Sequence, residues 1–343
     1  MDAPATEPPA APAPSPAPAA HRGPQVERHL VLVNRRGWQD PNDLYHIAAK
    51  VRWLDPTIGT FVVPGDLDDG VTRDAAASLP SLVVSFGPLG KFQPARGRVY
   101  QGRPIQKFEQ LKRLDAAGIP VPMTMMLGPD TALDPQRWGE FVIVKPTDIA
   151  SSSHGSGIQL MRTGRVRYIA PQDYPEGHPG RQGPMVVQQF IDTGSPLSAF
   201  RVMTLFDEPL ICQRATAMTG RPPLSSDDAV LEAAIVTTQG HPNAQKRKDL
   251  VYDADVIALA RKASRVIPEI PLKGCDILRD RRTGRVYVLE LNPGGNTWHF
   301  SSDFMASARA EDPPELSRQR LAQFDAFASA AHILVDRVRA EAE

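Results

Sequence analysis

The most informative segment of the chain reads Gly274-Cys-Asp-Ile-Leu-Arg-Asp-Arg-Arg-Thr-Gly-Arg-Val-Tyr-Val-Leu-Glu-Leu-Asn-Pro-Gly-Gly-Asn296. Its two β-rich runs flank one Arg-rich turn, a pattern that predicts an antiparallel hairpin. If the turn is centred on Thr283, the pairing sets Asp276 opposite Glu290, with Cβ atoms about 5 Å apart.

Asn292 follows Glu290 by two residues and is therefore expected on the same face of the strand. Three hard oxygen ligands, from Asp276, Glu290 and Asn292, would then converge on one side of a sheet. Such a set suits Mg²⁺ shared with substrate phosphates. Val286 and Val288 are expected to share the face of Glu290, so that the acid ends an apolar stripe where an unpaired carboxylate is costly. The alternative is an acidic, solvated face of a half-buried sheet.

The chain has 343 residues and 41% hydrophobic residues, enough for two or three subdomains with substantial cores. Residues 1–27 are rich in proline and alanine and poor in bulky apolar side chains, which predicts a disordered tail. The sequence has neither the pattern of a secretory signal nor an apolar run of about 18 residues. We therefore expect a cytoplasmic protein with no membrane partner.

Charge and cysteine content exclude several functional classes. The 39 basic residues equal the 39 acidic ones, so no overall field favours nucleic acid as a partner. Cys212 and Cys275 are the only cysteines, and both lie in apolar strand-like runs. They argue against a disulfide framework or a zinc cluster.

Apolar periodicity divides the rest of the chain into two parts. A small N-terminal α/β domain is predicted over residues 28–98, with strands at 29–33, 60–63 and 82–86 and a helix at 43–54. The remainder, residues 99–343, has an α+β pattern. Its predicted strands lie at 123–127, within 141–191 and in a hairpin at 199–214, and its predicted helices at 105–117, 230–234, 255–266 and 318–339.

A phosphate-binding element is predicted after the strand 141–145. Lys145 ends that strand and points with Phe141 and Ile143, and a Ser/Gly loop follows over residues 148–158. Hydroxyls and approachable backbone N–H groups can surround a phosphate, and the lysine supplies a compact positive charge. The alternative is a flexible turn with a surface lysine. Neither GxxxxGK(S/T) nor GxGxxG occurs, so no P-loop or Rossmann fingerprint competes.

The apolar strand at 185–191 turns into Asp192-Thr-Gly-Ser195. Its backbone groups and an amide side chain could meet the edge of a purine. A plain core strand is the alternative, because a backbone donor and acceptor pattern leaves little side-chain signature.

In chain order, these segments resemble the ATP-grasp superfamily over roughly residues 100–305. They are a helix lysine, Val-Ile-Val-Lys-Pro before the Ser/Gly loop, Val-Val-Gln-Gln-Phe-Ile, Phe-Arg-Val, and Glu-Leu-Asn-Pro-Gly-Gly-Asn. The resemblance is strongest to carboxylate-amine ligases similar to D-alanine-D-alanine ligase, glutathione synthetase and protein glutamate ligases. It implies an ATP-grasp fold in which two α+β subdomains, at 99–190 and 191–343, sandwich ATP next to the N-terminal α/β (pre-ATP-grasp) domain.

The resemblance also implies the site residues. Those that bind ATP are Lys107, Lys145, Ser151, Ser152, Ser153, Gly155, Gly157, Gln188, Gln189 and Phe190. Those that hold Mg²⁺, or Mn²⁺ as the alternative ion, are Asp276, Glu290 and Asn292. Those near the transferred phosphate, with surface charge on a hairpin as the alternative, are Arg201 and Arg214.

Two departures from the family pattern limit the resemblance. Ser198 and Ala199 stand where related ligases often have an acidic residue, which leaves the ribose contact unassigned. Gly274 stands where D-alanine ligases have an arginine that stabilises an oxyanion. The departure at Gly274 weakens the specific D-alanine ligase interpretation.

The implied activity is ATP- and Mg²⁺-dependent formation of an amide through an acylphosphate, with ADP and phosphate as products. The substrates would be a small-molecule or peptide carboxylate and an amine, and the sequence leaves a homo-oligomer open. Trp298, His299, Ser301 and Ser302 could line the acceptor pocket. The alternatives are a core position for Trp298 or Phe300 and a structural hydrogen-bonding role for His299. Two other functions stay open: a small-molecule kinase with the same fold, and a nucleotide-binding protein without turnover.

Overall fold

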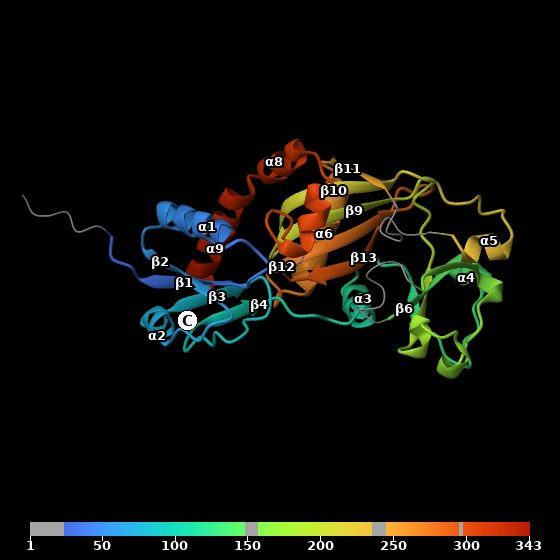
Figure 1. Cartoon of the computed structure of the whole chain (residues 1–343), viewed down its shortest axis with the longest axis horizontal. Coiled ribbons are helices and arrows are strands. Elements are labelled where there is room, and N and C mark those ends of the chain that lie inside the picture. The colour runs from blue at the N-terminus through green and yellow to red at the C-terminus, as the bar shows by residue number, and fades with distance from the viewer. Residues whose placement is uncertain (1–23, 148–156, 235–244, 295–297) are drawn as a thin grey trace, which may run out of the picture.

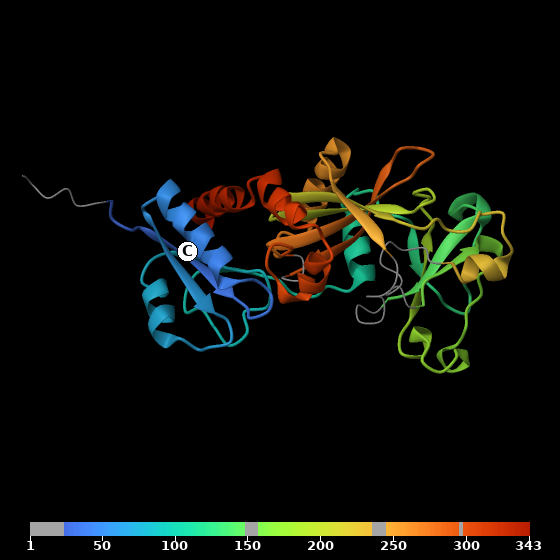
Figure 2. The ribbon, with the colours of Figure 1, turned by 45° about the horizontal axis from the view of Figure 1, so that its top comes forward.

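The computed structural model describes residues 24–147, 157–234, 245–294 and 298–343. Three separate sheets, each with its own helices, follow one another along the long axis of the molecule (Figure 1). The turned view in Figure 2 keeps the same order, with the N-terminal sheet at one end. The fold therefore combines α/β and α+β parts, as predicted. Within the described ranges, no helix combines the length and the apolar character needed to cross a bilayer.

The N-terminal sheet is parallel, with the strand order β2-β1-β3-β4. Its elements are β1 (Arg28–Asn34), α1 (Pro41–Leu54), β2 (Ile58–Pro64), α2 (Gly70–Ala77), β3 (Ser81–Ser85) and β4 (Arg98–Gln101). Leu30 and Leu32 pack with α1, while Val31 and Val33 pack on the opposite face with α2. Both faces of β1 are therefore buried, which explains its uninterrupted apolar sequence.

The second sheet is antiparallel, with the order β11-β10-β9-β12-β13. Its strands and the helix on one face are β9 (Ser198–Leu205), β10 (Glu208–Ala217), β11 (Lys246–Leu250), α6 (Ala254–Val266), β12 (Leu272–Arg279) and β13 (Val286–Pro293). Helix α6 packs on Cys275, Ile277 and Val288. Along β12, Asp276 stands between Cys275 and Ile277, and it therefore lies on the face away from α6.

The hairpin of β12 and β13 pairs Asp276 with Glu290, as predicted. A β-bulge follows, because the next pair joins Ile277 to Val288 and leaves Leu289 as an extra residue. Val286 and Val288 consequently pack toward α6 rather than beside Glu290. The expectation that these two valines share the face of Glu290 is wrong, since one inserted residue reverses the alternation of a strand.

The third sheet is antiparallel, with the order β5-β8-β6-β7. Its strands and the elements beside them are β5 (Thr124–Met126), α4 (Pro135–Trp138), β6 (Phe141–Pro146), β7 (Gln159–Arg162), η1 (Thr163–Arg165), η2 (Pro171–Asp173), η3 (Pro179–Arg181), β8 (Met185–Gln189) and α5 (Asp228–Glu232). Helix α3 (Lys107–Ala116) packs against β13. Gly118, with φ +72°, follows its C-terminus and ends the helix as predicted.

The C-terminal segment forms shorter helices than predicted. They are η5 (Asp303–Met305), α7 (Ala306–Ala310), α8 (Pro314–Gln323) and α9 (Ala326–Glu341). A single helix over 318–339 is wrong, because Asp325 has a left-handed φ of +44° that interrupts the helical hydrogen bonds. The break lets α8 pack on β10 and β11 while α9 packs on α1 and β1.

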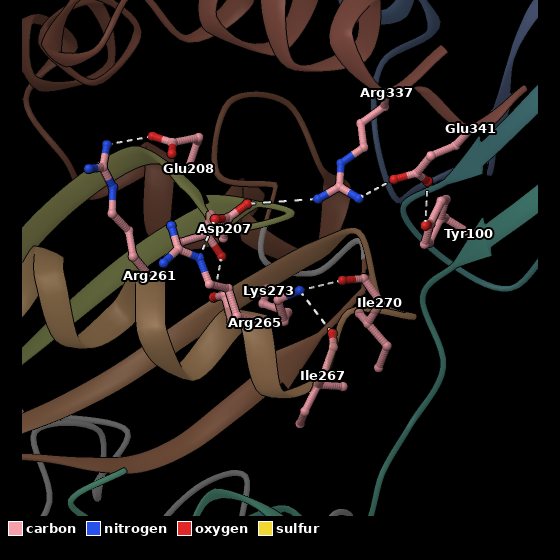
Figure 3. A network of polar contacts seen from close by, with 12 residues as sticks. Tyr100, Asp207, Glu208, Arg261, Arg265, Ile267, Ile270, Lys273, Arg337 and Glu341 are labelled. Carbon is pink, nitrogen blue, oxygen red and sulfur yellow. Dashed lines mark hydrogen bonds and ion pairs between the residues drawn. The ribbon is translucent and has the colours of Figure 1, made fainter. Parts of the chain in front are cut away.

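Polar contacts connect α9 to both of the sheets that it covers (Figure 3). Tyr100 on β4 donates a 2.5 Å hydrogen bond to Glu341, and Arg337 pairs with the same carboxylate at 2.5 Å. Arg337 also lies 3.9 Å from Asp207, in the turn between β9 and β10. The N-terminal and second sheets therefore share one polar network besides their apolar contacts.

Candidate active site

Asp276, Glu290 and Asn292 converge on the face of the second sheet away from α6. The side-chain amide of Asn292 donates to Asp276 Oδ2 at 3.0 Å and to Glu290 Oε1 at 3.2 Å. The three side chains predicted to hold a metal therefore lie together, because β12 and β13 pair in the predicted register at this point.

Two cations complete the group, which we name the Asp276 cluster (Asp276, Glu290, Asn292, Lys107 and Arg201). Lys107, the first residue of α3, places Nζ 2.8 Å from Glu290 Oε2. Arg201 on β9 lies directly opposite Asp276. Its guanidinium makes a two-pronged contact, with Nη2 at 2.7 Å from Oδ2 and Nε donating to Oδ1.

Burial and charge act in opposite directions on the two carboxylates. Burial raises the pKa of Asp276, and Glu290 adds to this, although Arg201 opposes it. Burial alone would also raise the pKa of Glu290, but Lys107, Lys145 and Arg201 outweigh it and lower that pKa to about 2. Two carboxylates held this close gain from any further positive charge between them.

The donor set of the cluster fits a hard divalent cation. Two carboxylates and one amide oxygen are ligands that Mg²⁺ and Mn²⁺ accept. Here the amide nitrogen of Asn292 faces both carboxylates, so its oxygen would turn toward them when an ion binds. Within the described parts of the chain, no group of three or more His, Cys, Asp and Glu side chains is arranged to hold a metal. A metal at the Asp276 cluster would therefore need Asn292 as its third protein ligand.

Lys145 lies at the end of β6, facing away from the apolar core of the third sheet. Its ammonium group donates to Gln188 Oε1 at 2.8 Å, and the Gln188 amide donates in turn to Thr124 Oγ1 at 2.9 Å. Burial lowers the pKa of Lys145 to about 8, although Glu290 opposes this. Gln188, predicted beside adenine, here positions the lysine.

The remaining predicted ATP contacts lie near the end of β8, just before β7, or outside the described residues. The backbone N–H of Gln189 donates to Met123 O at 2.8 Å, and the Phe190 ring lies 5.7 Å from the guanidinium of Arg221. Gly157 has φ +70°, a conformation that suits glycine. Ser151, Ser152, Ser153 and Gly155 lie outside the described residues.

Arg221 was not foreseen from the sequence. Its side chain is 5% exposed and bonds Asp192 at 2.9 Å, beside the predicted adenine contact Phe190. It belongs to a loop after β10 with no periodic pattern, so no signal in the sequence identifies it.

Arg214 is not part of the Asp276 cluster. It pairs in register with Phe200, which packs toward α6, and its nearest acidic partner is Asp249 at 3.5 Å. Arg201 and Arg214 therefore lie on opposite faces of the second sheet. The neighbouring Gln213 is on the face of Arg201, since those two residues form a cross-strand pair.

The residues after the metal asparagine are largely structural. Trp298 is fully buried in the core around α9, and its Nε1–H donates to Asp43 at 2.8 Å. Ser301 donates to the same carboxylate at 2.6 Å. The core position considered for Trp298 is therefore confirmed. His299 is buried, and burial together with nearby cations, Arg201 among them, lowers its pKa well below the usual value.

A cavity of about 510 Å³ adjoins the cluster, with Lys107 and Asn292 in its lining. It lies where the loop after β1, the segment before α3 and the end of β13 meet. The cluster and the cavity together offer a charged centre beside a mainly apolar chamber.

No protein-family model and no curated protein matches the chain. Solved structures to which the chain is similar include the ATP-grasp ligase PsnB with minimal precursor, Mg and ADP. Its identity is 15% and its TM-score 0.44, over 86% of this chain and 97% of PsnB. D-alanine–D-alanine ligase from Bacillus anthracis has 12% identity and a TM-score of 0.42, over 90% and 99% of the two chains. Macrocyclase MdnC with precursor peptide MdnA from Microcystis aeruginosa has 13% identity and a TM-score of 0.45, also over 90% and 99%.

Proposed function

We propose that the protein is an ATP-grasp ligase that uses ATP and Mg²⁺ to join a carboxylate to an amine. The observation that carries the proposal is the convergence of Asp276, Glu290 and Asn292 with Lys107 and Arg201 beside a chamber of about 510 Å³. A site that gathers hard metal ligands and cations suits phosphoryl transfer, which depends mainly on positioning and charge neutralisation.

The positions of the side chains support the following roles. Asp276, Glu290 and Asn292 would hold the ion, which supplies positive charge to the ATP phosphates. Lys107 and Lys145 would bind phosphate oxygens, and Arg201 would stabilise the charge on the transferring group. The substrate carboxylate would enter from the chamber next to Lys107 and Asn292. Attack of that carboxylate on the γ-phosphorus gives an acylphosphate and ADP, and attack by an amine gives the amide and phosphate.

Other features of the proposal depend on the sequence. The adenine would lie near Gln189 and Phe190, and Mn²⁺ would be the alternative ion. The same proposal includes domain boundaries at residues 27, 98 and 190 and a cytoplasmic location. Its substrates would be a small-molecule or peptide carboxylate and an amine. A homo-oligomer is compatible with it. Arg214 would act away from the phosphate, because it lies on the opposite face of the sheet.

The test is a screen of carboxylates and amines for release of ADP and inorganic phosphate in the presence of Mg²⁺. We expect release that needs both substrates and falls at least a hundredfold in Glu290→Gln. Glu315→Gln is the matched control, since Glu315 forms an exposed surface pair on α8. A phosphorylated product that accumulates with no amine and no free phosphate would identify a kinase. Nucleotide binding without turnover across the screen would remove the ligase assignment.

A further inference from the structure

The chamber beside the Asp276 cluster has a largely apolar wall that contains two aromatic rings. Its apolar lining includes Trp38, Pro88, Pro104, Ile105, Leu291 and Phe304. Phe304 is 73% exposed, so its ring has room to move and to cover a bound molecule. Apolar and ring-bearing walls stabilise a ligand by removing its own apolar surface from water.

The Trp38 wall is fixed in place before any ligand binds. A Cβ atom at Gly87 would lie 2.7 Å from the indole ring, so the ring packs directly on the glycine backbone. The backbone N–H of Asp303 donates to Gly37 O at 2.9 Å, which ties the Phe304 segment to the loop that carries Trp38. A preorganised wall loses little entropy when a ligand binds.

The charges around the chamber favour an anion. Arg36, Arg103 and Lys107 line it, and Asp303 is the one carboxylate among its described lining residues. Lys107 is also paired with Glu290 of the Asp276 cluster. Arg103 lies 3.6 Å from Glu269 with its side chain 61% exposed. Arg36 makes no hydrogen bond or ion pair within the part of the chain that the structure describes.

The volume of the chamber favours a ligand larger than a minimal acid. A dry cavity of about 150 Å³ already holds benzene, and the chamber has about 510 Å³. A two- or three-carbon acid would leave most of the apolar wall in contact with water. A ligand that contains a ring would cover Trp38 and Phe304 and still reach Lys107.

We propose that the chamber binds the acyl donor of the ligase, and that this donor is a carboxylic acid with a bulky, ring-bearing apolar body. The carboxylate lies at the end lined by Lys107 and Asn292, and the body lies between Trp38 and Phe304. The assignment as acyl donor rests on the proposed function, whereas binding of such an acid does not.

Three probes separate the contributions of ring and charge. 3-Phenylpropanoate carries both, propanoate lacks the ring, and 3-phenylpropanamide lacks the charge. We expect 3-phenylpropanoate to bind the full-length protein at least tenfold more tightly than either of the others, measured by calorimetry without nucleotide. Tenfold corresponds to about 1.4 kcal/mol, slightly less than full burial of one large apolar side chain contributes. Equal affinity for 3-phenylpropanoate and propanoate would overturn the proposal.

Two substitutions at one exposed position test the location. Phe304→Ala should weaken 3-phenylpropanoate about threefold to tenfold, and Phe304→Asp should weaken the acid more than the amide. Trp53→Ala, on α1 and 81% exposed, should change neither and serves as the control for loss of a surface ring. Affinity for Mg-ATP should stay unchanged in all three variants. Unaltered 3-phenylpropanoate binding in both Phe304 variants would contradict the assigned site.

Binding of the acid and turnover can fail separately. If 3-phenylpropanoate binds as expected but no carboxylate in the screen releases ADP, the chamber assignment stands and the ligase proposal fails. If ADP is released with small acids and 3-phenylpropanoate neither binds nor competes, the ligase proposal stands and the chamber assignment fails.

Discussion

Arg201 and Arg214 are both basic residues of the β9–β10 hairpin, yet only Arg201 reaches the Asp276 cluster. We therefore expect Arg201→Lys to lower kcat about a hundredfold, because a lysine cannot reproduce a two-pronged, charge-stabilising contact. Arg214→Lys is the matched control and should change kcat less than threefold. Both constants come from coupled ADP release with the best substrates of the screen. An equal loss of kcat in the two variants would mean that Arg201 and Arg214 have the same role although they lie on opposite faces of the sheet.

Lys145 should make nucleotide affinity depend on pH. Burial lowers the pKa of Lys145 to about 8, so the free protein loses this positive charge as the pH rises through 8. A neutral amine attracts phosphate less, and a shift of one pH unit above the pKa leaves about a tenth of the lysine protonated. We expect the affinity for Mg-ATP to fall up to tenfold from pH 7 to pH 9.

The control for the pH effect is Lys145→Arg, because arginine stays protonated throughout this range. Its affinity for Mg-ATP should remain nearly constant between pH 7 and pH 9. Fluorescence titration with a nucleotide analogue measures both proteins. A wild-type affinity that stays flat over the same interval would show that Lys145 does not contact the phosphates.

Lys273 on β12 forms hydrogen bonds at the end of helix α6 (Figure 3). Its buried ammonium group donates to Ile267 O at 3.1 Å and to Ile270 O at 2.5 Å, just after the last turn of the helix. Ile267 is the residue that ends α6, and its carbonyl also accepts from the Ile270 backbone N–H at 3.4 Å, so the lysine reinforces the turn that ends the helix. Burial nevertheless lowers the pKa of Lys273 to about 8.

The lowered pKa of Lys273 makes stability depend on pH, because the native and unfolded states bind different numbers of protons over one pH range. Between pH 8 and the unfolded value of 10.5, the native state has released the Lys273 proton and the unfolded state still holds it. Stability therefore rises with pH in this window, by up to about 2–3 kcal/mol. We expect wild type to gain free energy of unfolding relative to Lys273→Met between pH 8 and pH 10 in urea titrations. A difference between the two proteins that stays constant would contradict the lowered pKa.

The elements also explain what could be predicted. The Asp276–Glu290 pairing was predicted from a turn centred on Thr283, but the pair nearest the turn is Arg279 with Val286. The turn is therefore centred half a residue earlier, and the bulge at Leu289 restores the predicted pair. Turn length and alternation are local, and they are readable in a sequence. A bulge depends on packing against α6, which the strand sequence alone does not record.

The break between α8 and α9 has a similar cause. Apolar spacing continues from 318 to 339, so periodicity predicts one helix, and Asp325 is no strong helix breaker. The interruption is set by two different surfaces, one on β10 and one on α1. Arg221 and the Phe304 wall were likewise unpredictable, because they gather from loops that have no period.

One apolar core joins the N-terminal sheet to the second sheet. It contains Leu32 from β1, Leu205 from β9 and Leu272 from β12, with Leu334 of α9 among them. The chamber beside the Asp276 cluster lies between the same two parts. Its shape therefore depends on a helix from the far end of the chain.

Leu334 on α9 belongs to this shared core. Leu334→Ala should lower the free energy of unfolding by about 2–5 kcal/mol, because Leu334 is fully buried and the change leaves a cavity. Since α9 contacts both sheets, hydrogen exchange should accelerate in β1 and in β12 together. Val71→Ala, at an 82% exposed position on α2, should change the stability by less than about 0.5 kcal/mol. Faster exchange confined to α9 would mean that the two sheets are stabilised independently, and then the chamber between them would not depend on α9.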